Sequence, residues 1–245
     1  MTKVAIVTGG AGGIGRECCL KLTEAGVSII VADIDYAAAQ ETASDITSAG
    51  GNATAIHTDL SSVSEIQKMV ALTVEKHGTV HILVNNAGIM HTTGIEDITE
   101  NEWDSICSVN LKAVFFACQA VIPHFKANRY GKIVNISSLA GRNGGFAPGL
   151  AYSASKAGVI GLSKGLASRL AGYNINVNTV CPGTTRTTIL DCISAEGIRE
   201  LEQKIPLGRL GESADTANLV RFLCSDEASF ITGATIDING GMYIG

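Results

Sequence analysis

Tyr152 and Lys156, in the stretch Tyr-Ser-Ala-Ser-Lys, have the residue types and the spacing needed for proton transfer. If this segment is helical, residues four apart lie on one face. A phenol with its ordinary pKa of about 10 is a poor acid or base at neutral pH. A neighbouring ammonium favours the phenolate and lowers that pKa. The pair therefore suits acid–base chemistry, although the same spacing also occurs in surface pairs that have no function.

A glycine cluster near the N-terminus predicts a pyrophosphate site. In VAIVTGGAGGIG, residues 4–15, an apolar strand leads into Gly10-x-Gly12-x-x-Gly15 and the overlapping Gly9-x-x-x-Gly13-x-Gly15. Glycines let the backbone approach phosphates, and the N-terminus of the following helix supplies N–H donors and a positive dipole end. The position between a strand and a helix expected over 16–25 favours this reading over a glycine-rich surface loop.

Asp33 ends the next predicted strand, 18 residues after Gly15. A carboxylate at this place accepts hydrogen bonds from the adenosine ribose and repels a 2′-phosphate. The segment DIDYAAA that begins at Asp33 contains no lysine or arginine to favour NADP. The sequence thus predicts NAD as the cofactor, the alternative being an ordinary solvated aspartate at a strand end.

Apolar runs alternate with helical patterns along the whole chain. Their β-branched character is typical of a parallel sheet buried on both faces. Capping boxes are expected at Ser62-x-x-Glu65 and Thr99-x-x-Glu102. No linker or repeat divides the chain, so we expect one α/β, doubly wound domain over residues 1–245. The seven expected strands are residues 3–7, 28–32, 53–57, 81–84, 132–136, 176–180 and 234–238.

The composition excludes several classes of protein. The 245 residues carry a net charge of −5 without a cluster of basic residues, which disfavours nucleic acid as a partner. No uninterrupted apolar run approaches the roughly 18 residues of a membrane span; the longest candidate, residues 113–122, contains Gln119 and ends at Pro123. The first ten residues do not resemble a signal peptide. The seven cysteines include no CxxC pair, so we expect buried thiols in the cytoplasm and no metal site.

The motifs together resemble the short-chain dehydrogenase/reductase family over essentially the whole chain. The motifs that carry the resemblance are TGGAGGIG, Asp59-Leu60, Asn85-Asn86-Ala87-Gly88, Asn110, Ser137-Ser138, Tyr152-x-x-x-Lys156, Pro182-Gly183 and the closing ITGATIDINGG. The resemblance implies a Rossmann-type domain with a seven-stranded parallel sheet flanked by helices. It also implies a nicotinamide cofactor and a homotetramer or homodimer.

The resemblance assigns roles to four catalytic residues. It implies that Tyr152 is the general acid–base and that Lys156 both lowers its pKa and binds the nicotinamide ribose. Ser138 is expected to hold the substrate oxygen, and Asn110 to complete a proton relay. Ser138 is favoured over Ser137, although it lies one residue further from Tyr152 than the family pattern has it.

The same resemblance implies a set of cofactor contacts. The glycine turn is expected to bind the pyrophosphate, Asp33 the adenosine ribose, and Asp59 the adenine amino group. Asn86 and Gly88 are expected to line the ribose, whereas Asn85 buttresses the sheet. Pro182-Gly183 turns the chain over the nicotinamide, with Thr185 and Thr187 near its carboxamide. The full cofactor set is Gly9, Gly12, Gly13, Ile14, Gly15, Asp33, Asp59, Leu60, Asn86, Gly88, Tyr152, Lys156, Pro182, Gly183, Thr185 and Thr187.

The expected reaction is hydride transfer between NAD and a small secondary alcohol, polyol or hydroxy acid, or the matching carbonyl. The substrate pocket is expected at residues 89–93, 139–150 and a loop or lid over 184–205, which carry few aromatic side chains. Arg142 and Arg186 could meet an anionic group, although each is more often a surface residue.

Two alternatives stay open. The chain also resembles a 3-oxoacyl-[acyl-carrier-protein] reductase, with Arg129 at a position for carrier binding but Gly172 where a second basic residue is expected. A catalytically silent NAD-binding sensor or scaffold is disfavoured by the intact Ser138, Tyr152 and Lys156.

A homotetramer is expected from the face that Gly158, Gly161 and Gly165 form after Lys156, because glycines in a helix interior need a compensating close contact. A neighbour in the same subunit is the other explanation.

Overall fold

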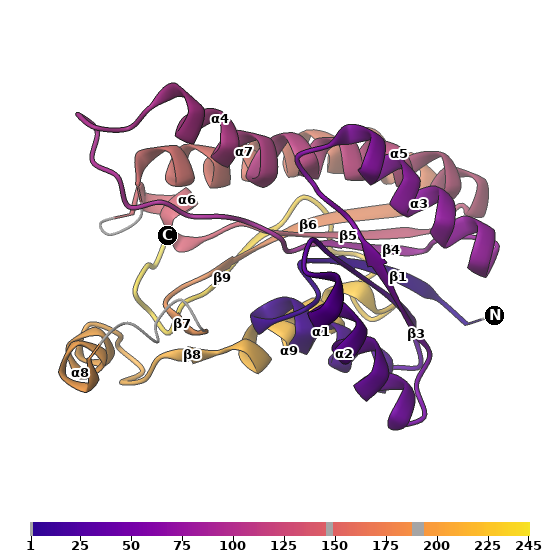
Figure 1. Ribbon diagram of the computed structural model, residues 1–245, viewed down its shortest axis with the longest axis horizontal. Coiled ribbons are helices and arrows are strands. Elements are labelled where there is room, and N and C mark those ends of the chain that lie inside the picture. Colours follow the sequence, from indigo (N-terminus) through magenta and orange to yellow (C-terminus); the bar gives the residue numbers. More distant parts are fainter. Residues whose placement is uncertain (1, 146–148, 188–193) are drawn as a thin grey trace.

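The computed structural model describes residues 2–145, 149–187 and 194–245 (Figure 1). Seven parallel strands form one sheet in the order β3-β2-β1-β4-β5-β6-β9. This confirms the expected fold, with each strand end within two residues of its predicted place. The strands are β1 (Val4–Thr8), β2 (Ser28–Asp33), β3 (Ala53–His57), β4 (Ile82–Asn85), β5 (Gly131–Ile136), β6 (Ile175–Pro182) and β9 (Thr235–Ile238).

The strand order reverses at β1, which pairs with β2 on one side and with β4 on the other. In open parallel sheets, ligands bind in the crevice beyond the carboxyl ends of the strands at such a reversal. The topology therefore places the candidate site at the ends of β1 and β4. The glycine turn follows β1, and the turn Asn86–Gly88 follows β4.

Helices cover both faces of the sheet (Figure 1). One core lies between the sheet and α1, α2 and α9, and the other between the sheet and α3, α5 and α7. The buried strands are apolar on both faces because each face packs on a helix layer. The longer helices are α1 (Gly13–Glu24), α2 (Tyr36–Ser48), α3 (Val63–His77), α4 (Glu100–Cys107), α5 (Ala113–Asn128), α7 (Leu150–Leu170) and α9 (Ser213–Cys224).

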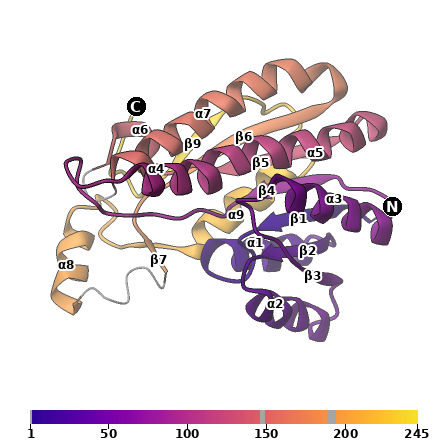
Figure 2. The same ribbon diagram turned by 45° about the horizontal axis from the view of Figure 1, so that its top comes forward.

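Short elements lie beyond the carboxyl end of the sheet. They are α6 (Leu139–Asn143), the parallel pair β7 (Thr185–Arg186) and β8 (Gly211–Glu212), and α8 (Ala195–Gln203). Both views show the C-terminus beside α6, and α8 set apart from the helix layers (Figures 1 and 2). Of the expected substrate loop at 184–205, residues 188–193 lie outside the described part of the chain.

The run Glu100–Asn128 is helical throughout and is long and apolar enough to cross a membrane by length and composition alone. It combines α4, a π-helical turn at Ser108–Lys112, and α5. The helix continues past Pro123, where the apolar run in the sequence ends. Its side chains Ala117, Val121 and Phe125 are buried in the core against the sheet. The run therefore behaves as a core helix, which passes the same test of length and composition.

The two expected capping boxes differ in outcome. Thr99 and Glu102 form a complete box at the start of α4. At the start of α3, Ser62 accepts a hydrogen bond from the Glu65 backbone N–H. The Glu65 carboxylate, however, accepts from the backbone N–H of Asp59 at 2.8 Å. Glu65 thus fixes the turn after β3 rather than closing a box.

Candidate active site

Ser138, Tyr152 and Lys156 come together where β5 ends. Ser138 is the N-cap of α6, directly after β5, while Tyr152 and Lys156 lie one turn apart on α7. The Lys156 ammonium lies 5.7 Å from the centroid of the Tyr152 ring. Lys156 is buried, and its Nζ donates a hydrogen bond to the Ile136 carbonyl at 2.9 Å.

Burial dominates the protonation of the tyrosine–lysine pair. It raises the pKa of Tyr152, and interaction with the Ser138 hydroxyl opposes this rise only in part. Burial also lowers the pKa of Lys156 to about 8. The expected lowering of the tyrosine pKa by Lys156 is not met in this geometry, because desolvation outweighs it and the ammonium is held at the Ile136 carbonyl. The tyrosine is therefore a neutral phenol at pH 7.

The two serines after β5 have different environments. The Ser137 hydroxyl donates to the backbone carbonyl of Lys156 at 2.8 Å and is buried. The Ser138 hydroxyl accepts a hydrogen bond from Ala140 N–H at 3.1 Å and lies by Tyr152. Ser138 is therefore the serine placed to reach an oxygen beside the tyrosine, whereas Ser137 fastens α7 to the sheet.

Asn110 is fully buried in the π-helical turn and locks the loop after β4. Its amide oxygen accepts from Ile89 N–H at 2.8 Å, and its amide nitrogen donates to the Ile89 carbonyl and to Ser155 Oγ. A Cβ on Gly88 would lie 3.1 Å from Lys156 Nζ and 3.2 Å from Asn110 Oδ1. Gly88, Asn110 and Lys156 thus form one packed unit.

The glycine turn has the geometry of a pyrophosphate cradle. Gly9 and Gly13 have φ angles of +64° and +51°, in the left-handed region. A Cβ on Gly15 would lie 1.9 Å from the Gly9 carbonyl oxygen, whereas a Cβ on Gly12 would meet nothing within 4 Å. Gly12 caps α1 without a side chain, so the first N–H groups of the helix remain available to an anion. Ile14 lies in the first turn of this helix.

Asn86 supports this turn from β4. Its Nδ2 donates to the carbonyl oxygens of Thr8 and Gly9 at 3.2 and 3.0 Å. The side chain expected to line the ribose is thus used to brace the glycine turn. The buttressing side chain Asn85 donates to Asn135 Oδ1 at 2.8 Å, across to β5.

Two carboxylates lie at or just after the ends of β2 and β3, where the adenosine is expected. Asp33 Oδ2 accepts from Ala11 N–H at 3.0 Å, and its Oδ1 accepts from Asp35 N–H at 3.1 Å. Asp33 therefore sits at the glycine turn with lone pairs left for ribose hydroxyls. Asp59 Oδ1 accepts from Ser61 N–H, and hydrogen bonding from Ser61 lowers the pKa of Asp59. Leu60 packs against the core.

The turn after β6 is anchored by the end of the chain. Gly183 N–H donates to the Ile238 carbonyl at 3.0 Å, and a Cβ on Gly183 would lie 2.8 Å from Asn239 Cα. Thr185 Oγ1 donates to the Gly183 carbonyl at 3.2 Å. Thr187 Cγ2 lies 3.5 Å from the place of a Cβ on Gly13. Thr187 thus lies beside the phosphate turn, and its expected contact with the carboxamide stays a prediction.

The residues of the crevice fit a nicotinamide dinucleotide. At the glycine turn, Gly12 has open space around it and the start of α1 has no side-chain cap, which leaves room and N–H donors for a pyrophosphate. The Asp33 carboxylate lies next to this turn, where the ribose is expected. The turn at Pro182-Gly183 ends β6, the strand that pairs with β5, after which Ser138 lies. The two arginines considered for an anionic substrate are both neutralised: Arg142 pairs with Asp237, and Arg186 with Glu202 and Glu212.

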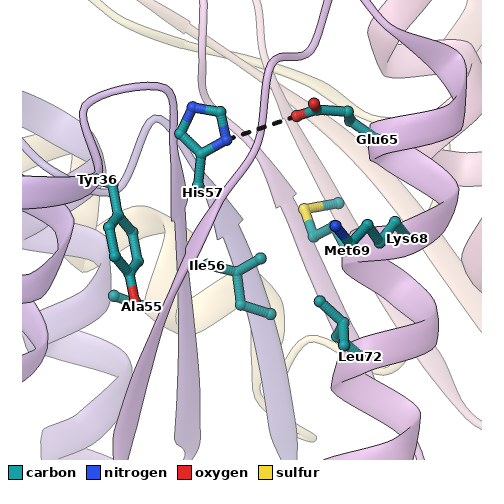
Figure 3. Close-up of a pocket in the computed structure, with 8 residues that line it drawn as sticks. All are labelled: Tyr36, Ala55, Ile56, His57, Glu65, Lys68, Met69 and Leu72. Atoms are coloured by element: carbon teal, nitrogen blue, oxygen red, sulfur yellow. Dashed lines mark ion pairs between the residues drawn. The ribbon is translucent and has the colours of Figure 1, made fainter.

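A cavity of about 270 Å³ lies outside this crevice, at the edge strand β3 between α2 and α3 (Figure 3). Tyr36 and Leu72 stand on opposite sides of it, and His57 faces Glu65 at 3.6 Å across its end. His57 is the register partner of Asp33. The cavity therefore flanks the ribose end of the crevice without containing any predicted catalytic residue.

The fold and the site define a Rossmann-type oxidoreductase that depends on a nicotinamide cofactor. A family model described as enoyl-(acyl carrier protein) reductase, of the short-chain dehydrogenase/reductase class, matches residues 9–243. The chain belongs to the short-chain dehydrogenase/reductase family and is an oxidoreductase that acts on CH–OH or carbonyl groups.

Three similar proteins cover nearly the whole chain. The 3-oxoacyl-[acyl-carrier-protein] reductase FabG of Staphylococcus aureus strain Mu50 is 41% identical over 100% of this chain and 99% of its own length. The (2S)-[(R)-hydroxy(phenyl)methyl]succinyl-CoA dehydrogenase subunit BbsD of Thauera aromatica is 35% identical over 98% of this chain and 96% of its own length. The crystal structure of gox2181 superposes with a TM-score of 0.95, at 35% identity and with 98% and 95% of the two chains covered.

Proposed function

We propose that the protein interconverts a 3-oxoacyl thioester and the corresponding 3-hydroxyacyl thioester, using NADH and NAD. The observation that carries the proposal is the full-length similarity at 41% identity to a reductase named for 3-oxoacyl-[acyl-carrier-protein]. A second relative is named for an acyl-CoA substrate. These relatives favour the thioester alternative over the polyol and hydroxy-acid reading of the sequence.

Side chains near the site support an acyl substrate. Met90 and Leu150 are large, apolar and exposed. Their segments are joined where Gly149 N–H donates to the His91 carbonyl at 3.0 Å, just before the catalytic helix. Exposed apolar groups beside a polar reaction centre suit an acyl chain better than a polyol. Arg142 is paired with Asp237 and Arg186 with two glutamates, so neither guanidinium is as open to a hydroxy acid as an unpaired one would be.

The protonation states favour reduction at neutral pH. Because burial raises the pKa of Tyr152, the phenol carries the proton that the carbonyl oxygen needs when it becomes a hydroxyl. The Ser138 hydroxyl, beside the phenol, donates a hydrogen bond to the same oxygen and holds it in place. Bound nicotinamide supplies the hydride. Lys156 has a pKa of about 8. In this proposal it binds the ribose hydroxyls and restores the proton that Tyr152 gives to the substrate oxygen.

Purified protein, NADH and acetoacetyl thioesters test this function. We expect NADH oxidation with acetoacetyl-coenzyme A, acetoacetyl-acyl carrier protein or both, followed at the nicotinamide absorbance. Polyols, small ketones and hydroxy acids form the comparison set. Turnover of that set alone, with no activity on either thioester, would refute the thioester proposal while keeping the enzyme class. A protein that binds the cofactor but turns over neither set would support the sensor or scaffold reading.

The two thioester carriers are distinguished by geometry. Arg129 ends α5 in the left-handed conformation, before β5 begins, while Ser138 follows the end of β5. The six residues of β5 separate them by roughly 20 Å. The Lys126 ammonium lies over the ring of Tyr173, the residue after Gly172. It therefore places a cation near the position where the second basic residue is missing. Because Arg129 has no second arginine at Gly172 and the chain carries a net charge of −5, we expect an acidic carrier protein to bind poorly and coenzyme A thioesters to be the better substrates.

Asp33 underlies the proposed preference for NAD. Its carboxylate, held by Ala11 and Asp35 N–H groups, would repel a 2′-phosphate. Asp33→Ser is expected to narrow the NAD-to-NADP ratio of kcat/KM about 10- to 150-fold, the value of a hydrogen bond to a charged group. Asp35→Ser is the matched control, because serine can still cap α2. Equal use of both cofactors by the unmodified protein would contradict the role of Asp33.

We also propose a homotetramer in the cytoplasm. Trp103 on α4 and Phe115 on α5 are exposed apolar side chains, as expected of a helix surface that meets a second copy. The glycine face of α7 supports a homotetramer less than the sequence suggested. Gly158 is explained within the subunit, since a Cβ there would lie 2.8 Å from Leu111, whereas Gly161 faces open space. Light scattering at micromolar concentration tests the assembly, and a mass near 25.4 kDa would contradict it.

A further inference from the structure

Arg142 and Asp237 form an ion pair beside the catalytic serine. The guanidinium Nη2 lies 3.2 Å from Asp237 Oδ2, and each side chain is only 18% exposed. Arg142 belongs to α6 and Asp237 to β9, so the pair joins elements far apart in the sequence. Taking two charges out of water is costly, and loss of one partner would leave the other uncompensated.

The pair holds the short helix that begins at Ser138. Arg142 lies one turn after Ser138, in the last turn of α6. A Cβ on Gly141 would lie 2.8 Å from the Lys156 carbonyl carbon and from Ser137 Oγ, so α6 packs tightly on α7. A helix of five residues has little stability of its own. The contacts of Arg142 therefore add to those of Gly141 in holding α6, and with it Ser138, in place.

The other end of the pair holds the turn after β6. Asp237 is the register partner of Cys181, which precedes Pro182, and Ile238 accepts the hydrogen bond from Gly183 N–H. The chain then turns back, with Asn239 Nδ2 donating to the Tyr243 carbonyl at 3.2 Å. The Tyr243 ring stacks on the Arg142 guanidinium, whose Cζ lies 5.0 Å from the ring centroid.

The pairing is incomplete in a way that suits positioning better than stability. Arg142 Nε and Asp237 Oδ1 are buried and have no hydrogen-bond partner among the described residues. A buried pair joined by one contact is weak evidence for a stabilising role, because desolvation offsets the attraction. The contact does, however, hold α6 in a defined position relative to β9.

We propose that Arg142 is a positioning residue for the reaction. Its ion pair with Asp237 and its stacking on Tyr243 tie the helix of Ser138 to the strand and C-terminal turn that anchor Gly183. The donor for the substrate oxygen and the turn over the nicotinamide are thereby held in a fixed relation. The kinetic part of this inference rests on the proposed oxidoreductase function. The alternative role for Arg142 is direct binding of an anionic group of the substrate.

Kinetics on Arg142→Met and Asp237→Asn separates the two roles. Positioning predicts that both variants lower kcat about 10- to 100-fold, the range expected for a displaced catalytic group. KM should change little, and the loss should be the same for neutral and anionic substrates. The double variant should be no worse than the poorer single one, and Arg142→Lys should recover part of kcat. Arg209→Met is the matched control, since Arg209 forms an exposed ion pair with Asp215.

Hydrogen exchange gives a readout that does not depend on turnover. In Arg142→Met and Asp237→Asn we expect faster exchange in residues 138–145 and 239–243, but not in α1 or α3. This measurement decides the inference even if the protein proves inactive on every substrate tested. A rise in KM for anionic substrates alone, with kcat and exchange unchanged, would overturn positioning in favour of substrate binding. Variants indistinguishable from Arg209→Met would also overturn it.

Discussion

Burying the charged Lys156 side chain lowers the stability of the folded protein, and the variant Lys156→Met should show by how much. Burial lowers the pKa of the lysine from its ordinary 10.5 to about 8. At about 1.4 kcal/mol per pKa unit, keeping the ammonium charged near neutral pH disfavours the folded state by about 3 kcal/mol. Methionine fills a similar volume without the charge, although it leaves the Ile136 carbonyl without this donor.

The pH dependence isolates the charge from the lost hydrogen bond. Between about pH 8 and 10.5 the unfolded chain binds a proton at Lys156 that the folded chain has released, so stability rises with pH through this window. Relative to Lys156→Met, the unmodified protein should gain about 2–3 kcal/mol of unfolding free energy from pH 7 to pH 10. Every other titrating group is common to both proteins and cancels in the difference.

Denaturant or thermal unfolding at several pH values, at one fixed protomer concentration, measures this difference. For a chain of this length, 1 kcal/mol corresponds to roughly 2–4 °C in Tm, so the two Tm curves should converge by about 5–10 °C. Lys164→Met, an exposed position on the same helix, serves as the control and should run parallel to the unmodified protein. Parallel curves for Lys156→Met would refute the buried-charge reasoning.

Three further outcomes follow from the geometry. Tyr152→Phe should lower kcat about 10²- to 10⁴-fold with cofactor affinity nearly unchanged; retention of a tenth of the activity would remove Tyr152 from its role. Gly15→Ala should abolish NADH binding in a fluorescence titration, because its Cβ would lie 1.9 Å from the Gly9 carbonyl oxygen, whereas Gly172→Ala meets nothing and should bind normally. Thr99→Ala breaks the capping box of α4 and should cost about 0.5–2 kcal/mol, seen as a Tm lower by a few degrees; an unchanged Tm would show that the cap adds nothing.

The sequence predicted the sheet well because its signals are local. The seven strands are apolar runs bounded by polar or glycine residues. The inner strands are buried on both faces as their pattern indicates, whereas the edge strands β3 and β9 are only half-buried. The glycine turn was equally readable, since Gly9 and Gly13 adopt left-handed conformations that favour glycine. The Thr99 box formed as its spacing predicts, whereas the Glu65 carboxylate accepts from Asp59 N–H instead of closing the box at Ser62.

The features that sequence reasoning missed depend on contacts between distant segments. Arg142 could be considered for an anionic substrate, but nothing near it in the chain points to Asp237. The amide of Asn86 could not be assigned to the Thr8 and Gly9 carbonyls without the pairing of β1 and β4. The π-helical turn that holds Asn110 is not preceded by a proline or glycine, so no residue type in the sequence predicts it.

The anchoring of Gly183 by Ile238 has a consequence for synthesis of the chain. The glycine turn after β1 is braced by Asn86 from the first half of the chain, but the residues of β9, the last strand of the sheet in chain order, are made late. Until those residues leave the ribosome, the edge of β6 is unpaired and the turn at Gly183 has no anchor. A nascent chain could thus assemble the phosphate half of its crevice well before the half that reacts. The open edge of β6 would meanwhile be a strand that another nascent chain could pair with.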